Sequence, residues 1–253
     1  QVRSPLTDAR ALTGYDRGQL FKILHTQNIH KRWNFFLEYK RLNSLSFYNA
    51  NQNKQSNVVV SSNYRTKDGV YEVKGYFLTE KMELQEFGGI DSVELFTENL
   101  QPTRILLNTR LSQDERTLYN RDIFIGQSLD LLKWLQQRDT TKTNADNKKL
   151  SLDHEVRYIR RSFSYQGNGI SGFYPDYFYS NGTYLDSLSY QHFENAIYAN
   201  SVFGDTSKFE FKAGLKQINW SQYNQFYNFS TNGLGLDGQL SGNYRDYFPP
   251  STS

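Results

Sequence analysis

The sequence predicts an all-β fold, an antiparallel transmembrane β-barrel with about ten strands in this chain, and three observations predict it. Apolar and polar residues alternate through many segments, several of them longer than the strands of ordinary globular sheets. The charged positions of these segments carry both signs, as in a wet barrel interior. Aromatic residues make up 16% of the 253 residues and gather toward segment ends, where membrane barrels carry aromatic girdles.

The bulk composition narrows the protein classes further. No run of about 18 apolar residues occurs, which excludes a transmembrane helix. The 29 basic and 26 acidic residues give a net charge of +3, too balanced to predict nucleic-acid binding. The absence of Cys excludes a disulfide framework and a thiolate metal site. The first residues are polar and show no signal peptide, so we expect a cytosolic, mature or trimmed chain.

Four segments carry the alternation most clearly. In "RWNFFLEYK" (32–40) only Phe36 breaks it, and the pattern recurs in "VYEVKGYF" (70–77), "KFEFKAGLKQI" (208–218) and "GLGLDGQLSGNY" (233–244). The "TKDG" between two such runs predicts a tight hairpin turn. Asn- and Lys-rich tracts predict long loops, so short turns on one side and long loops on the other are expected. The predicted strands are 18–29, 32–43, 57–66, 70–80, 117–129, 150–165, 184–199, 207–219, 222–230 and 232–245.

Several places do not fit simple alternation. In 150–165 the apolar residues occupy even positions up to Tyr158 and odd positions at Phe163 and Tyr165, which a β-bulge or an exit from the membrane would explain. The region 86–116 has mixed parity and is expected to be a loop, with a weak strand candidate at 103–111. "LDLLKWLQQ" (129–137) predicts one or two turns of helix.

No segment predicts chemistry. In "DHE" (153–155) the neighbours Asp153 and His154 would point to opposite faces of a strand, beyond the reach that an acid–base pair needs. No spacing of a zinc or calcium site is present, and "GNGISG" (167–172) lacks the Lys of a phosphate-binding loop. We therefore expect no enzyme activity, no metal and no cofactor.

An ordered series of motifs resembles a known family. "HTQNIHKRWNFFLEYKRLNSLSFYNANQNKQSN" (25–57), "SSNYRTKDGVYEVKGYF" (61–77) and "QEFGGI" (85–90) are similar to segments of the Bacteroidota putative porin family of outer-membrane β-barrels. "LSLDHEVRYIRRSFSY", "FY" at 173–174, "YLDSLSYQHFENAIYAN" and "AGLKQI" follow in the same order. In "EFGGI" an Asn would be expected where Phe87 stands. Family members look longer at both ends, so the resemblance implies that this chain can be a portion of a larger barrel.

The resemblance also implies a setting. It implies that the protein is located in the bacterial outer membrane and contacts outer-membrane lipids and lipopolysaccharide. Other outer-membrane subunits are possible further partners, and no nucleic-acid partner is expected. Envelope proteins of that phylum carry O-glycans at Asp-Ser/Thr-aliphatic sites, which makes Thr140 in "DTT" (139–141) the candidate modification site. The expected organisation is an N-terminal extension at 1–17, a barrel at 18–248 and a tail at 249–253.

Strand parity assigns a face to each residue of the alternating segments. The polar parity, expected to line the lumen, comprises Arg32, Asn34, Glu38, Lys40, Glu72, Lys74, Lys208, Glu210, Lys212 and Lys216. The apolar parity, expected to face lipid, comprises Trp33, Phe35, Leu37, Tyr39, Tyr71, Val73, Phe77, Phe209, Phe211 and Leu215.

The predicted faces are compatible with two functions, and they also leave one alternative fold open. The first function is passive diffusion of small hydrophilic solutes through a porin-like channel. The second is a non-conducting accessory or scaffold barrel in an outer-membrane complex, its lumen filled by side chains or by the 86–116 segment, because barrels near eight strands leave little open space. The competing fold is a soluble all-β domain with its apolar parity turned toward a second layer.

Overall fold

The computed structural model describes most of the chain. The backbone is described for residues 4–14, 18–45, 48–101, 103–111, 114–138, 149–167, 184–203, 207–224 and 229–246. Within these ranges, side chains are left undescribed at 105, 136–138, 149, 184–185, 202–203, 207–214, 220, 222–224 and 229–246. Thr140 and the tail at 249–253 lie outside the described residues.

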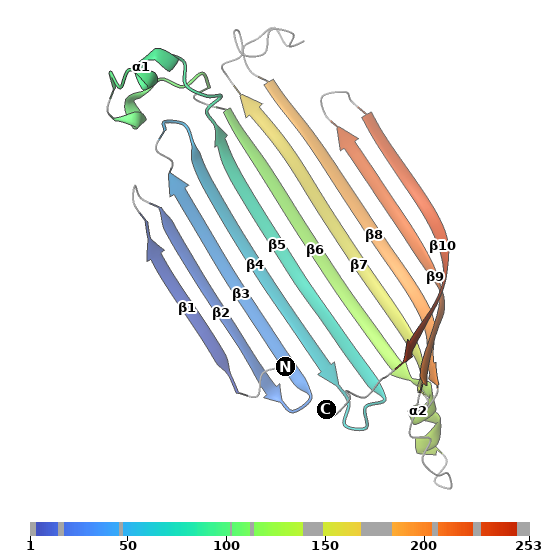
Figure 1. The fold of residues 1–253 in the computed structure, drawn as a ribbon. Coiled ribbons are helices and arrows are strands. Elements are labelled where there is room, and N and C mark those ends of the chain that lie inside the picture. Colours follow the sequence, from blue (N-terminus) through green and yellow to red (C-terminus); the bar gives the residue numbers. More distant parts are fainter. Residues whose placement is uncertain are drawn as a thin grey trace.

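The described strands form one antiparallel sheet in which each strand pairs with its neighbours in sequence, in the order β1 to β10 (Figure 1). Such an up-and-down order needs only hairpin connections. The strands are β1 (Leu6–Thr13), β2 (Gln19–His30), β3 (Trp33–Leu45), β4 (Gln52–Arg65), β5 (Tyr71–Glu86), β6 (Asp114–Asp130), β7 (Lys149–Gly167), β8 (Tyr184–Phe203), β9 (Ser207–Asn224) and β10 (Phe229–Asp246). The ten-stranded all-β prediction is thus confirmed.

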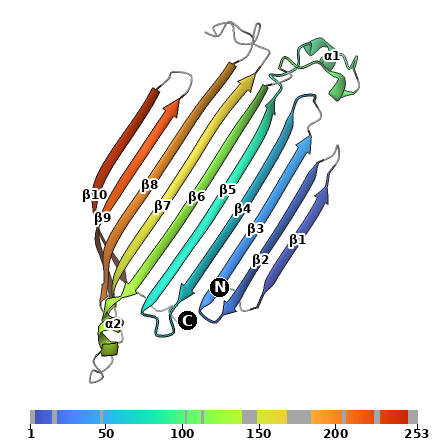
Figure 2. The same ribbon diagram turned by 180° about the vertical axis from the view of Figure 1, so that it is seen from behind.

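The sheet is a single layer. Neither Figure 1 nor the reverse view in Figure 2 shows an element lying across either face. Among the described elements, each strand makes its extensive contacts with its sequence neighbours, and helix α2 (Leu131–Arg138) contacts β6 and β7. A soluble sandwich requires a second sheet or helical layer over the apolar face, and none is present in the described part of the chain.

The 66–70 connection shows how local sequence sets a turn. Gly69 adopts a φ of +68°, a left-handed conformation that costs a residue with a Cβ. The Gly69 amide donates to the Thr66 carbonyl at 3.1 Å, and the Thr66 amide donates to the Tyr71 carbonyl at 2.9 Å. The predicted tight hairpin at "TKDG" is therefore confirmed.

The connections differ between the two ends of the sheet. The loop end, where β5 ends and β6 begins, carries the connections 14–18, 46–51, 87–113, 168–183 and 225–228. The turn end carries 31–32, 66–70, 131–148 and 204–206. Long connections thus concentrate at the loop end, but 131–148 is a long exception at the turn end. The predicted asymmetry is present only in part.

Two short helices lie beyond the strand ends. Helix α1 (Val93–Thr97) lies in the 87–113 connection beyond the loop end of the sheet, and none of its residues is buried (Figure 1). Helix α2 (Leu131–Arg138) follows β6 directly, as the sequence predicted for 129–137. In the described part of the chain, no helix is long and apolar enough to cross a membrane.

Three sequence expectations need correction. Residues 1–17 were expected to be an extension, but they contain β1, which pairs with β2 from Leu6–Thr26 to Thr13–Gln19 and so continues the sheet. The expected strand 222–230 does not exist as one element, because β9 ends at Asn224 and β10 begins at Phe229. The candidate strand 103–111 contains the 3-10 helix η2 (Arg104–Leu106) and an isolated bridge between Thr109 and Ile90.

Candidate functional site

The strand register divides the sheet into two chemically different faces. Residues paired across antiparallel strands point to the same side, and successive residues of a strand point to opposite sides. One row of pairs runs Leu37–Val60–Phe77–Ile123–Tyr158–Phe193 across β3 to β8. We call the side that carries this row the band face. The opposite side, which carries Glu38, Asp122, Arg157 and Glu194, is the ion-pair face.

The band face carries an apolar band that no described residue covers. Large apolar side chains lie exposed on it from β2 to β9, including Leu215, which is 73% exposed, and Ile197, which is 49% exposed. In water, an uncovered apolar surface of this kind would mark an interaction site or a site of aggregation. The other exposed large apolar residues of this face are Phe21, Trp33, Tyr64, Ile125, Leu152 and Phe193.

The residues predicted to face lipid lie together on the band face as far as the structure describes them. Parity and register place there Trp33, Phe35, Leu37, Tyr39, Tyr71, Val73, Phe77 and Leu215. The side chains of Phe209 and Phe211 lie outside the described residues. That this face meets hydrocarbon remains a prediction.

The ion-pair face is organised around Asp122 on β6. Arg157 on β7 binds both oxygens of this carboxylate, from Nε to Oδ1 at 3.1 Å and from Nη2 to Oδ2 at 2.6 Å. The Tyr76 hydroxyl on β5 donates to the same Oδ2 at 3.2 Å. A bidentate guanidinium–carboxylate pair is among the stronger and more directional polar contacts. It ties three neighbouring strands together on this face.

A second network links β8 to β9 on the same face. Tyr190, His192 and Glu194 follow one another at every second position of β8, so their side chains share a side. The Tyr190 hydroxyl lies 3.0 Å from His192 Nδ1, and His192 Nε2 lies 2.6 Å from Glu194 Oε1. Lys216 Nζ on β9 lies 3.0 Å from the same Glu194 oxygen. Sequence analysis missed this chain, although the i, i+2, i+4 spacing in a predicted strand was a signal for it.

Two further ion pairs join strands at the N-terminal side of the face. Lys22 on β2 lies 3.1 Å from Glu38 on β3, and Arg65 on β4 lies 2.7 Å from Glu72 on β5. Lys74 lies over the Phe124 ring with its Nζ 6.0 Å from the centroid. Charges of opposite sign on neighbouring strands thus pair with one another on this face.

The residues predicted to line a lumen lie mostly on this face. Register places there Asn34, Glu38, Lys40, Glu72, Lys74 and Lys216. Arg32 is the exception, because it lies in the turn between β2 and β3 and has no strand parity. The side chains of Lys208, Glu210 and Lys212 lie outside the described residues. Whether the face borders water remains a prediction.

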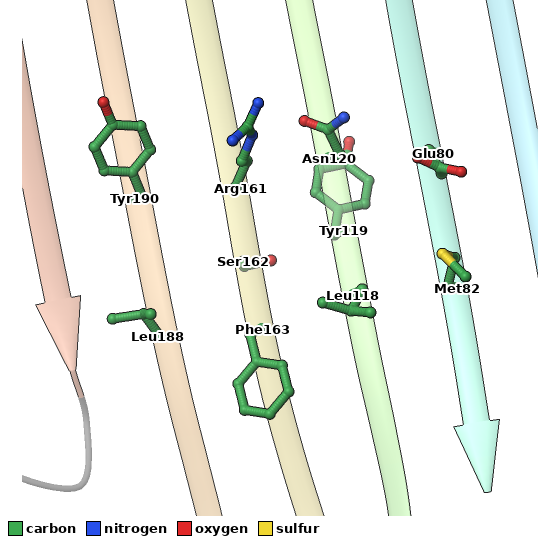
Figure 3. Close-up of a pocket in the computed structure, with 10 residues that line it drawn as sticks. All are labelled: Glu80, Met82, Leu118, Tyr119, Asn120, Arg161, Ser162, Phe163, Leu188 and Tyr190. Carbon is green, nitrogen blue, oxygen red and sulfur yellow. The ribbon is translucent and has the colours of Figure 1, made fainter.

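The alternation inverts toward the loop end. On β7, Leu152, Val156 and Tyr158 lie on the band face, whereas Phe163 and Tyr165 lie on the ion-pair face. The β6–β7 pairing runs without a shift from Glu115–Gln166 to Asp130–Ser151, which excludes a bulge as the cause. The neighbouring strands invert with it, so that Met82, Leu118, Phe163 and Leu188 line a hollow on the ion-pair face (Figure 3).

The "DHE" segment shows the separation that the sequence predicted. Asp153 lies on the ion-pair face and His154 on the band face, where His154 Nε2 lies 2.9 Å from Asn195 Oδ1. The two side chains therefore share no site.

A single antiparallel sheet, apolar on one face and ion-paired on the other, with strands of 12 to 20 residues from β2 onward, is the wall of an outer-membrane type β-barrel. The sequence matches the family described as "Putative porin" over residues 1–248, and the chain belongs to that family. No curated protein matches the sequence.

Solved structures support the fold. The ferric-catecholate import receptor Fiu of E. coli K12 is similar with a TM-score of 0.60 at 14% identity, covering 88% of this chain and 35% of the receptor. The siderophore receptor PiuA of Acinetobacter baumannii is similar with a TM-score of 0.58 at 10% identity, covering 95% of this chain and 38% of that one. The chain thus spans little more than a third of either receptor, and at these identities the likeness concerns the fold alone.

Proposed function

We propose that this chain forms a wall of a bacterial outer-membrane barrel that lets small hydrophilic solutes diffuse passively. The separation of the two faces carries the proposal: an exposed apolar band on one side suits lipid, and a charged, paired surface on the other suits a water-filled interior. Membership of the family described as "Putative porin" supports this proposal. We also propose that the protein comes from the Bacteroidota, as the resemblance of its motifs implies.

The band face supports lipid as the partner of this wall. Beyond the apolar band toward the loop end, Arg121 and Arg160 lie directly opposite one another on β6 and β7, with Arg41 further along on β3. Positively charged guanidinium groups beyond the edge of the apolar band suit the anionic headgroups of outer-membrane lipids and lipopolysaccharide. We propose no nucleic-acid partner, no cofactor and no catalytic role, while other outer-membrane subunits remain candidate partners.

The open edges of the sheet bear on whether the barrel conducts. In the described strands, β1 pairs only with β2 and β10 only with β9, so two edges lack partners. Closure by further strands would give a lumen wide enough for solutes, whereas closure of β1 on β10 would leave little open space. The second case favours the alternative function, a non-conducting accessory or scaffold barrel in an outer-membrane complex.

Single-channel recording in a planar bilayer tests the proposal. We expect stepwise current with the wild-type protein and a reversal potential that shifts toward cation preference in Lys74→Glu, because Lys74 is exposed on the ion-pair face. Arg41→Glu, on the band face, is the matched control and should leave the reversal potential unchanged. Absence of current across a range of salts and voltages would reject the channel and leave the scaffold function.

A further inference from the structure

The hollow on the ion-pair face has two rows of different chemistry. It is an open hollow over β5 to β8 with a volume of about 510 Å³, within the usual range of small-molecule sites (Figure 3). Register makes the two rows continuous across the four strands. The apolar row comprises Met82, Leu118, Phe163 and Leu188; the polar row comprises Glu80, Asn120, Arg161 and Tyr190.

Two members of the polar row are already engaged. Glu80 Oε1 accepts a hydrogen bond from Gln55 Nε2 at 2.7 Å. The Tyr190 hydroxyl lies 3.0 Å from His192 Nδ1. These contacts leave the centre of the row, Asn120 and Arg161, as the groups that can meet a ligand.

Arg161 and Asn120 have unmet bonding capacity. Arg161 is exposed and makes no hydrogen bond or ion pair with any side chain in the described ranges. The carboxylate diagonal to it on β6, Asp122, is held by Arg157 through both oxygens. Next to Arg161, Asn120 Oδ1 is buried without a hydrogen-bond partner. Within the described ranges, a guanidinium without a side-chain partner beside an apolar row defines a site for an anion that also carries an apolar body.

We propose that this hollow binds a small amphiphilic anion, a molecule with one carboxylate and an apolar body. The carboxylate pairs with the Arg161 guanidinium, which offers a planar set of donors for bidentate contact. The apolar body covers the row from Met82 to Leu188, where removing apolar surface from water supplies affinity. The inference rests on the proposed function, since the ligand must reach this face from a wet interior.

The chemistry of the site disfavours other solutes. A fully hydrophilic solute would leave the apolar row in contact with water and gain only the polar contacts. A cation would meet the unpaired charge of Arg161. The hollow would therefore select amphiphilic anions from among the solutes that enter the barrel.

Equilibrium dialysis of the full chain in lipid nanodiscs, with 3-phenylpropionate as the probe, tests this site. We expect saturable binding to the wild type and about tenfold weaker binding to Arg161→Gln, which removes the charge and keeps a polar, hydrogen-bonding side chain. Asn120→Asp should weaken binding similarly, because it supplies Arg161 with a carboxylate partner from within the protein. Arg41→Gln removes an equal charge from the band face and should bind as the wild type does.

Other results would overturn the proposal. Absence of saturable binding would do so. Equal losses of affinity in Arg161→Gln and Arg41→Gln would also do so, because they would indicate attraction to the net charge of the protein only.

The neutral 3-phenylpropan-1-ol should bind equally to wild type and Arg161→Gln. An equal loss of affinity for this alcohol in Arg161→Gln would mean that Arg161 only shapes the hollow. Channel recording distinguishes failure of the binding site from failure of the proposed channel function. Conductance without saturable binding would reject the site and leave the channel function intact.

Discussion

The two halves of strands β5 to β8 use the same alternation with opposite orientation. In the half toward the turn end, apolar residues such as Ile125 and Val156 lie on the band face, and charged residues such as Arg157 lie on the ion-pair face. In the half toward the loop end, Phe163 and Leu118 lie on the ion-pair face, while Ser162 lies on the band face. The difference teaches that the face carrying the apolar residues can change along one strand without a bulge, as expected if parity follows the solvent that each side meets.

Strand length gives this inversion a physical reason. β8 has 20 residues, about twice the 9–11 that a bilayer span requires. The part that spans lipid must be apolar on its outer side, whereas the part that projects into water need not be. The apolar residues can then turn inward, where they line the hollow beside Arg161.

The largest effect is expected from a charge placed in the apolar band. Ile123→Arg on β6 should lower the free energy of unfolding by about 2–4 kcal/mol, the cost of Arg near the middle of a bilayer. Thr117→Arg lies on the same strand and face toward the loop end and is the matched control, with a cost of about 0–1 kcal/mol. Urea titration of the protein folded in vesicles measures both; equal costs would contradict the inversion.

A smaller effect is expected from the central ion pair. Asp122→Asn removes the negative charge and leaves Arg157 and Tyr76 a single acceptor oxygen in place of two, at a cost of about 1–2 kcal/mol after allowance for the partial exposure of Arg157. A double-mutant cycle with Arg157→Gln in the same urea titration isolates the pair. A coupling energy near zero would show that the pair contributes nothing to the fold.

The smallest effect is expected on the band face beyond the apolar band, where we predict contact with water. Ser162→Leu, on the band face beyond the apolar band, should change the free energy of unfolding by no more than about 0.5 kcal/mol, as at an ordinary wet surface. A clear stabilisation in vesicles would instead indicate that hydrocarbon reaches this level, and would move the upper limit of the band.

The sequence predicted those parts of the fold that local chemistry determines. Alternation identified β3, with Phe36 as the one break, and β5, and "TKDG" with Gly69 identified the hairpin turn between β4 and β5. β1 was missed because Leu6, Asp8, Arg10 and Leu12 mix apolar and charged residues on one face of an edge strand. The boundary between β9 and β10 was missed because "QYNQFYNFS" (222–230) contains no Gly or Pro to mark it.

The candidate site was predictable only in part. Parity alone separated Glu72 and Lys74 from Val73, but the partner of each charge depends on the register between strands, which the sequence does not display. The changed parity at Phe163 was visible in the sequence, with a bulge and a membrane exit as its two explanations. Only the unshifted β6–β7 register excludes the bulge.

Labelling of single-Cys variants tests the central claim most directly, because the chain contains no native Cys. With the protein in vesicles, a water-soluble maleimide should modify Lys216→Cys on the ion-pair face and leave Leu215→Cys on the band face unmodified. Ser162→Cys, on the band face but beyond the apolar band, should be modified again. Equal modification of Leu215→Cys and Lys216→Cys, or protection of Ser162→Cys, would contradict the account.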